Sequence, residues 1–126
     1  MIIKIHSYAF HVLRVGLGIT FACVGILILQ EPAAWTGFIK PWAADILITT
    51  PEKAMIGTAI FDIVIGFFLL VDFWTFWFSL LAAFHLALVL LVSGIDAITV
   101  RDIGLLAGAL AMAVNLWPEN KNTRSF

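Results

Sequence analysis

Four long apolar stretches, separated by short polar or proline-containing breaks, constrain this chain more than any other feature of its sequence. They cover about residues 9–30, 52–71, 73–93 and 99–117. Each is close to the ~20 residues that an α-helix needs to cross the hydrocarbon core of a bilayer. Hydrophobic residues make up 63% of the chain and charged residues 12%, which is far from the balance of a small soluble domain. The sequence therefore predicts a polytopic membrane protein.

We expect one all-α domain over residues 1–126, a transmembrane four-helix bundle with an interfacial segment between its first and second helices. This segment, about 31–51, is punctuated by Pro32, Pro41 and Pro51 and mixes aromatic and aliphatic residues with charges. Such a mixture suits a segment in the headgroup region that contains one short amphipathic helix. A lid over the bundle is one role for it. Simple packing of an amphipathic linker explains the same pattern, and we prefer that interpretation.

Helix boundaries are marked by short capping patterns. Thr50 followed by Pro51 offers an N-cap and a proline at the first helical position. Thr99 and Asp102 have the spacing of a capping box, with Asp in place of Glu. Asp72 is the polar break between the second and third stretches, and we expect it to cap the third. These two helices should therefore form an antiparallel hairpin.

Aromatic and basic residues predict the orientation in the membrane. Tryptophan and tyrosine favour both membrane–water interfaces. On this pattern the long-loop side carries Trp35 and Trp42, and the other side carries Tyr8, Trp74, Trp77 and Trp117. The basic residues divide into Lys4, Arg14, Lys121 and Arg124 on the terminal side and Lys40, Lys53 and Arg101 on the other. This slight excess predicts a multi-pass protein of the cell membrane with both termini in the cytoplasm.

The composition excludes several classes of function. The net charge is −1, and the scattered basic residues form no patch that could hold nucleic acid. Cys23 is the one cysteine, so the chain alone cannot perform dithiol exchange. One histidine lies at membrane depth, which argues against haem or iron–sulfur ligation. The sequence predicts no metal site.

Asp62 lies near the centre of the second stretch, roughly ten residues or ~15 Å from either end. An aspartate at that depth is too short to reach the headgroups, so it must protonate, pair with a cation or face a wet cavity. Two interpretations remain open. One is a structural ion pair between Asp62 and Arg14, and the other is a role in binding a ligand or handling protons.

Arg14 and His85 are the other ionisable residues within these stretches. Arg14 shares a helix face with Gly18 and Gly25, which suggests a face turned toward other helices. Its shallow position also allows the side chain to extend to the headgroups. His85 can be an interior donor bonded to a backbone carbonyl, the interpretation that we slightly favour. Near Asp62 it could instead relay protons or hold a quinone carbonyl.

The fourth stretch begins with Arg101 and Asp102 and continues with Gly104 and Gly108 at GxxxG spacing. The charged pair suits an interfacial anchor, a bundle mouth or a contact with a partner. The glycine spacing gives a flat packing ridge, which suits packing within the bundle or a homodimer seam. We also assign Gly18, Gly25 and Gly66 to helix packing.

Motifs in three of the predicted helices resemble those of the DoxX-like family of small integral membrane proteins. The motifs are residues 13–19 with Phe21 and Gly25, Asp62 four residues before Gly66, and residues 101–109. Together they span about residues 8–117. The second helix has Asp where the family more often has Glu, which shortens the reach of the carboxylate by one methylene.

The resemblance implies a four-helix bundle with a reentrant or interfacial segment after the first helix, and a link to redox biology. Its namesake relatives are subunits of a thiosulfate:quinone oxidoreductase, and the broader group includes assembly factors and membrane chaperones. We therefore expect an accessory subunit of a membrane redox complex that binds a quinone or a partner oxidoreductase. Arg14, Asp62 and His85 would form its interior polar site, with Arg101 and Asp102 at the mouth.

Two other hypotheses stand beside the redox subunit. One is a non-catalytic membrane scaffold or chaperone, whose polar residues pair internally. The other is a small-molecule transporter, which would have to oligomerise because one four-helix unit is small for alternating access. The sequence does not decide whether the chain itself catalyses a reaction.

Overall fold

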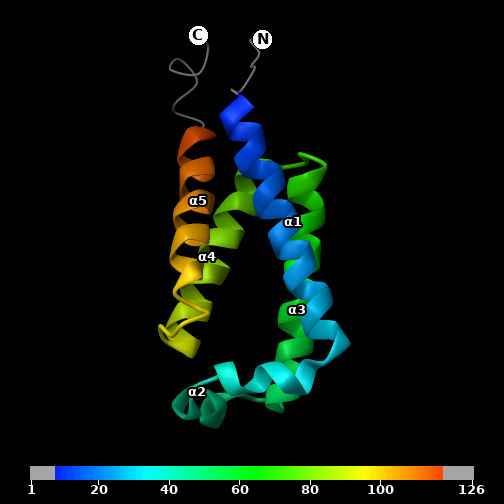
Figure 1. The fold of residues 1–126 in the computed structure, drawn as a ribbon, viewed down its shortest axis with the longest axis vertical. Coiled ribbons are helices and arrows are strands. Elements are labelled where there is room, and N and C mark those ends of the chain that lie inside the picture. The colour runs from blue at the N-terminus through cyan, green and yellow to red at the C-terminus, as the bar shows by residue number, and fades with distance from the viewer. Residues whose placement is uncertain (1–7, 118–126) are drawn as a thin grey trace.

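The computed structural model describes residues 8–117, and that part of the chain is all-helical (Figure 1). Its elements are α1 (Tyr8–Gln30), the 3₁₀ helix η1 (Pro32–Phe38), α2 (Pro41–Ile46), α3 (Pro51–Leu70), α4 (Thr75–Ser93) and α5 (Arg101–Asn115). The four long helices begin and end within two residues of the predicted bounds. The structure of this part of the chain therefore confirms the predicted all-α fold class and the positions of the long helices.

Three of these helices, α1, α3 and α4, are long and apolar enough to cross a membrane. The fourth predicted span is shorter than expected, because α5 has 15 residues. At 1.5 Å per residue this helix is ~22 Å long, less than the ~30 Å of a bilayer's hydrocarbon core. Length and composition thus support three of the four predicted spans.

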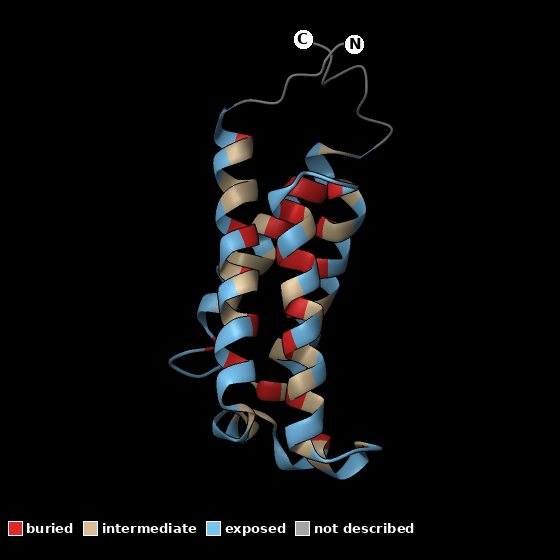
Figure 2. Cartoon of the chain, turned by 90° about the vertical axis from the view of Figure 1, so that its right-hand side faces the viewer, coloured by how far each residue is buried: buried red, intermediate tan, exposed pale blue. Residues whose placement is uncertain are grey.

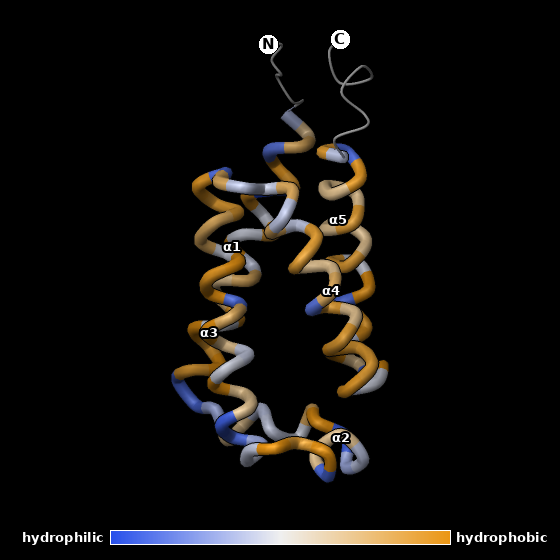
Figure 3. The backbone as a smooth tube through the Cα atoms, turned by 180° about the vertical axis from the view of Figure 1, so that it is seen from behind, coloured by the Kyte–Doolittle hydropathy of each residue, from blue (hydrophilic) through white to orange (hydrophobic). Residues whose placement is uncertain are grey.

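The long helices associate as two pairs, α1 with α3 and α4 with α5. Contacts between the pairs are fewer, and the pairs diverge toward the end that carries η1 and α2 (Figures 1 and 3). Helix α1 begins and α5 ends at the opposite end of the molecule, beside the α3–α4 turn. The molecule is thus built from two packed hairpin-like units joined most firmly at one end.

Glycines allow α1 and α3 to approach backbone to backbone. A Cβ added to Gly66 would lie 2.6 Å from both the Ala22 nitrogen and the Gly18 carbonyl oxygen. A Cβ on Gly25 would lie 2.6 Å from the Ala59 carbonyl oxygen. Real Cβ atoms do not approach backbone atoms this closely, so any larger residue would force the two helices apart. These three glycines lie directly at the α1–α3 contact.

The main core lies between the four long helices at the firmly joined end. Its buried residues are Phe10, Leu17, Phe21, Ile65, Leu69, Ala82, Ala83, Leu86, Ala109 and Met112. Large apolar side chains such as Val12 and Phe84 remain exposed, and buried and exposed positions alternate along the long helices (Figure 2). An apolar outer surface around an inner core is what lipid-facing helices require.

The segment between α1 and α3 forms two short helices, η1 and α2, where the sequence predicted one (Figure 1). Trp35 and Ile39 pack against a second apolar cluster at the ends of α1 and α3. The backbone N–H of Lys40 donates to the carbonyl oxygen of Val92 in α4, at 3.1 Å. This segment therefore connects the diverging ends of the two helix pairs. Its exposed apolar residues, Trp42 and Ile46, suit the predicted position in the headgroup region.

The predicted helix caps were partly correct. Thr50 accepts a hydrogen bond from the Lys53 backbone N–H at 3.2 Å, as expected for the start of α3. The predicted capping box at α5 was wrong, because Val100 occupies the N-cap and the Thr99 hydroxyl donates to the Gly94 carbonyl oxygen instead. Asp72 does not cap α4, whose N-cap position is Trp74.

Candidate functional site

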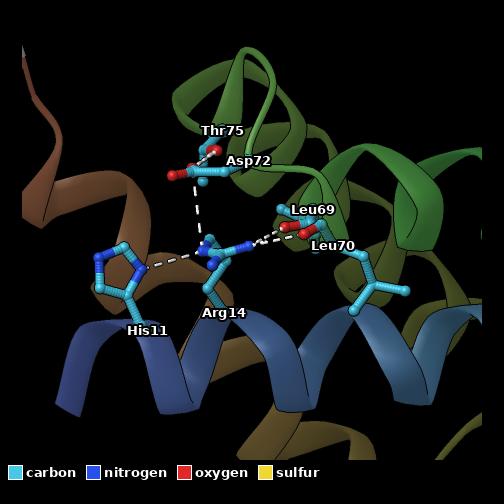
Figure 4. A network of polar contacts seen from close by, with 6 residues as sticks. All are labelled: His11, Arg14, Leu69, Leu70, Asp72 and Thr75. Carbon is cyan, nitrogen blue, oxygen red and sulfur yellow. Dashed lines mark hydrogen bonds and ion pairs between the residues drawn. The ribbon is translucent and has the colours of Figure 1, made fainter. Parts of the chain in front are cut away.

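Arg14 connects the first turns of α1 to the C-terminal end of α3 (Figure 4). Its Nη1 donates to the carbonyl oxygens of Leu69, at 2.7 Å, and Leu70, at 3.0 Å. The last carbonyls of a helix lack part of their intrahelical bonding and carry the negative end of the helix dipole. Arg14 therefore caps α3 from a neighbouring helix.

The same guanidinium has two further partners, one in α1 and one in the α3–α4 turn. Nε donates to Nδ1 of His11 at 3.2 Å and lies 3.9 Å from Oδ1 of Asp72 (Figure 4). The hydroxyl of Thr75 also donates to the Asp72 carboxylate. Asp72 adopts a φ of 58°, a left-handed conformation that is uncommon outside glycine. These contacts hold a tight α3–α4 turn, and they place Arg14 with Asp72, not with Asp62.

Asp62 and His85 meet in the interior of the molecule. Nε2 of His85, in α4, lies 2.9 Å from Oδ1 of Asp62, in α3. Asp62 is 5% exposed, so this contact is closed to bulk solvent. The ring of Phe61 stands edge-on to the imidazole, with 4.9 Å between the ring centroids. This ionisable pair therefore joins one helix pair to the other.

The Asp62–His85 contact has the distance of an ion pair but not the direction of a good hydrogen bond. Oδ1 of Asp62 is buried without a well-directed donor, because the ring N–H of His85 does not point straight at it. The pair can hold one proton in two ways, as aspartate with imidazolium or as carboxylic acid with neutral imidazole. Both forms are neutral overall, which is the cheaper state at membrane depth.

Asp102 is a third ionisable residue in this region. It lies half-buried in the first turn of α5 and interacts electrostatically with both Asp62 and His85. Its neighbour Arg101 is exposed. The two residues that the sequence placed together at the bundle mouth therefore differ in exposure, because Asp102 is half-buried and Arg101 is exposed.

Sequence reasoning missed Asp96, which organises the α4–α5 connection. Its Oδ1 accepts backbone hydrogen bonds from Thr99 and Ile98, both at 2.8 Å. These two bonds, with a contribution from the charge of Lys40, hold the pKa of the Asp96 carboxyl below its ordinary value. The signal in the sequence was an aspartate soon after Gly94, because aspartate side chains commonly bond backbone N–H groups two or three residues ahead.

The remaining predicted positions have different surroundings. A Cβ on Gly108 would meet Leu13 Cδ1 at 3.2 Å, so this glycine faces α1. Nothing lies within 4 Å of the equivalent position on Gly104. Within residues 8–117, no group of three or more histidine, cysteine, aspartate or glutamate side chains is arranged to hold a metal ion.

Three apolar helices of spanning length, with an ionisable pair buried between two of them, define an integral membrane protein. The DoxX family model matches residues 9–95, and the chain belongs to the DoxX family. The match includes Arg14, Asp62 and His85 and ends before α5. Neither a curated protein nor a solved structure matches the chain.

Proposed function

We propose that this DoxX-family protein is an accessory subunit of a membrane redox complex, and that it binds a quinone headgroup beside Asp62 and His85. The observation that carries the proposal is the Asp62–His85 contact buried between α3 and α4, with a carboxyl oxygen that accepts no well-directed hydrogen bond. A buried ion pair stabilises a fold poorly compared with apolar side chains of similar volume. Ionisable residues at membrane depth are therefore functional candidates by default.

The chemistry of the pair suits a quinone. A ring N–H of His85 can donate to a quinone carbonyl oxygen, and the spare oxygen of Asp62 can accept from a quinol hydroxyl. Phe61 supplies an aromatic neighbour for the headgroup. Reduction of a quinone to a quinol consumes two electrons and two protons. The electrons would come from a partner oxidoreductase subunit, and the pair would hold a proton beside the reacting oxygen.

We also propose that α5 completes a four-helix transmembrane bundle, with the chain termini in the cytoplasm. Helix α5 packs along α4. Hydrogen-bonded turns between Asp96 and Ile103 lead into its first residues. The segment formed by η1 and α2 would then lie at the opposite membrane surface.

Direct quinone binding tests the proposed function. The full chain, reconstituted in nanodiscs, would be titrated with ubiquinone-2 and menaquinone-2 by calorimetry. We expect saturable binding of one of these probes, and Asp62→Asn and His85→Gln should each weaken it about tenfold or more, as loss of one buried hydrogen bond would. Asp45→Asn, which changes an exposed carboxylate on α2, is the matched control. Non-saturable partitioning, or equal affinity in all four proteins, would contradict the proposal.

A non-catalytic scaffold or membrane chaperone is the second candidate, and the contacts of Arg14 favour it. The Nε and Nη1 groups of this arginine both donate to groups of the chain itself, as a structural role requires. Capture of partners from native membranes distinguishes the two candidates. A scaffold would hold the same partner proteins when Asp62 and His85 are both replaced by leucine, without an associated quinone in the wild type.

A further inference from the structure

The two helix pairs are connected differently at their two ends. Near the α3–α4 turn, Phe68 stacks on Phe78, with 4.6 Å between the ring centroids. The contact between Asp62 and His85 lies near the middle of both helices. Beyond it the pairs diverge (Figures 1 and 3), and among the described residues no ring or polar contact joins residues 51–60 of α3 to residues 86–93 of α4. The Asp62–His85 pair is thus the last such contact before the diverging end.

The segment between α1 and α3 lies at this diverging end and belongs mainly to the first helix pair. Its 3₁₀ helix η1 packs against α3 and α1, and Trp35 and Ile39 join the second apolar cluster there. Neither η1 nor α2 packs extensively against α4 or α5, although α2 lies below the ends of these helices in Figures 1 and 3. The connection to the second pair therefore depends on Lys40, which lies between the two short helices.

Lys40 contacts the end of α4 through both its backbone and its side chain. Its N–H donates to the carbonyl oxygen of Val92 at 3.1 Å. The last carbonyls of a helix lack intrahelical donors, so Lys40 supplies one of them from another segment. Its side chain lies across Gly94, where an added Cβ would be 2.8 Å from Lys40 Cε. Gly94 ends α4 with a φ of 72°, in the left-handed region that favours glycine.

We propose that the hydrogen bond from the Lys40 N–H to the Val92 carbonyl oxygen holds the diverging ends of the two helix pairs together, and that a quinone reaches the Asp62–His85 pair when this bond opens. Its opening would let α3 and α4 separate at this end while the stacked rings near the turn stay in contact. The inference rests on the proposed function for its ligand, whereas the restraint is a property of the helices themselves.

The variant Lys40→Pro removes this donor without straining the local backbone. Lys40 has a φ of −64° and the preceding Ile39 has a ψ of 118°, and both values suit a proline at position 40. The Lys40 carbonyl oxygen, which accepts from the N–H groups of Ala43 and Ala44, is retained. The matched control is Lys40→Ala, which removes the same side chain but keeps the N–H.

Spin labels on the full chain in nanodiscs measure the separation of the helices by double electron–electron resonance. Cys23 is exposed, so Cys23→Ser removes the native thiol from the background. The pair Gly57→Cys with Leu91→Cys reports the diverging end, and the pair Phe67→Cys with Trp77→Cys reports the end at the turn. All four labelled positions are exposed.

We expect Lys40→Pro to raise the ratio of separated to joined conformers at the diverging end about tenfold, as loss of one hydrogen bond would. The distance at the turn end should not change, and Lys40→Ala should stay close to the wild type. An equal change in Lys40→Ala would contradict the inference, because that variant keeps the donor. Wild-type distances in a folded Lys40→Pro protein would also overturn it.

A second variant keeps the inference testable if Lys40→Pro does not fold. Gly94→Ala places a Cβ against Lys40 Cε and strains a left-handed residue, so it should also separate the diverging ends. Its control is Gly104→Ala, where an added Cβ meets nothing within 4 Å. Wild-type distances in a folded Gly94→Ala protein would then overturn the inference.

The restraint and the quinone site fail in distinguishable ways. Separated ends in Lys40→Pro, without saturable binding of ubiquinone-2 or menaquinone-2 to any of the proteins, would leave the restraint standing and refute the quinone site. Wild-type distances, together with quinone binding that depends on Asp62, would refute the restraint alone. Where both hold, the quinone should associate faster with Lys40→Pro than with the wild type, and equal association rates would refute the entry route.

Discussion

The surroundings of Arg14 and of Asp62 differ in a way that separates structure from function in this molecule. Both are ionisable residues in apolar helices, and both contact a neighbouring helix. Arg14 donates to two helix-terminal carbonyls and one imidazole nitrogen and lies beside a carboxylate. Asp62 has one partner at ion-pair distance and an oxygen without a well-directed donor. A group that donates to several partners in the chain holds the fold, whereas one with an unpaired oxygen retains the capacity to bind.

The largest expected effect on stability comes from removing the satisfied group. Arg14→Leu should lower the free energy of unfolding by about 3 kcal/mol, because it leaves two carbonyl groups of α3 without their charged donor. Unfolding by sodium dodecyl sulfate in mixed micelles measures this change. The control is Arg101→Leu, which removes an exposed arginine and should change stability by a few tenths of a kcal/mol. Equal losses of unfolding free energy in the two variants would contradict the structural role assigned to Arg14.

The interior pair should behave in the opposite way. Replacing Asp62 and His85 together by leucine should leave stability within about 1 kcal/mol of the wild type or raise it, because apolar residues often substitute for a buried ion pair without loss. The same double variant should lose quinone binding. Changing Asp62 alone to leucine should destabilise the protein, since the imidazole then lacks its partner. A large stability loss in the double variant would show that the pair is structural.

The smallest expected effect concerns Asp96 and acid. The pKa of its carboxyl is lower in the folded protein than in the unfolded chain, because backbone N–H groups bond the ionised form. Its contribution to stability is therefore present above the unfolded pKa of about 3.9 and is lost as pH falls through the lower folded value. Thermal unfolding between pH 6 and pH 3 should show a smaller acid-induced decrease for Asp96→Asn than for the wild type. Parallel curves would contradict this.

Helix positions were predictable because apolar composition and local caps are encoded within short windows of sequence. Thr50 and Pro51 fix the start of α3 through bonds that span three residues. The partners of Arg14 were not predictable, because they are backbone carbonyls more than 50 residues away. Their position depends on a turn in which Asp72 adopts a left-handed conformation.

The candidate site was predicted in part. Asp62 and His85 stood out because ionisable residues are rare within apolar helices, and the structure brings them together. Asp102 was assigned to the mouth because it follows Arg101 in the sequence. Consecutive residues on a helix point about 100° apart, so one faces inward and the other outward. The position of α5 relative to α4 depends on the Asp96 turn, and this long-range consequence is not visible in the residues of α5.

The backbone contact between α1 and α3 fixes the axial register of these two helices. Gly18 and Gly66 fit against each other without side chains, and sliding either helix by one turn would bring larger residues into the same space. We therefore expect α1 and α3 to move as one rigid unit. Any change in the distance between Asp62 and His85 would then require movement of the other helix pair, α4 and α5. Access to the interior would then depend on how far α4 and α5 tilt. The hydrogen bond from the Lys40 N–H to the Val92 carbonyl oxygen restrains this tilt.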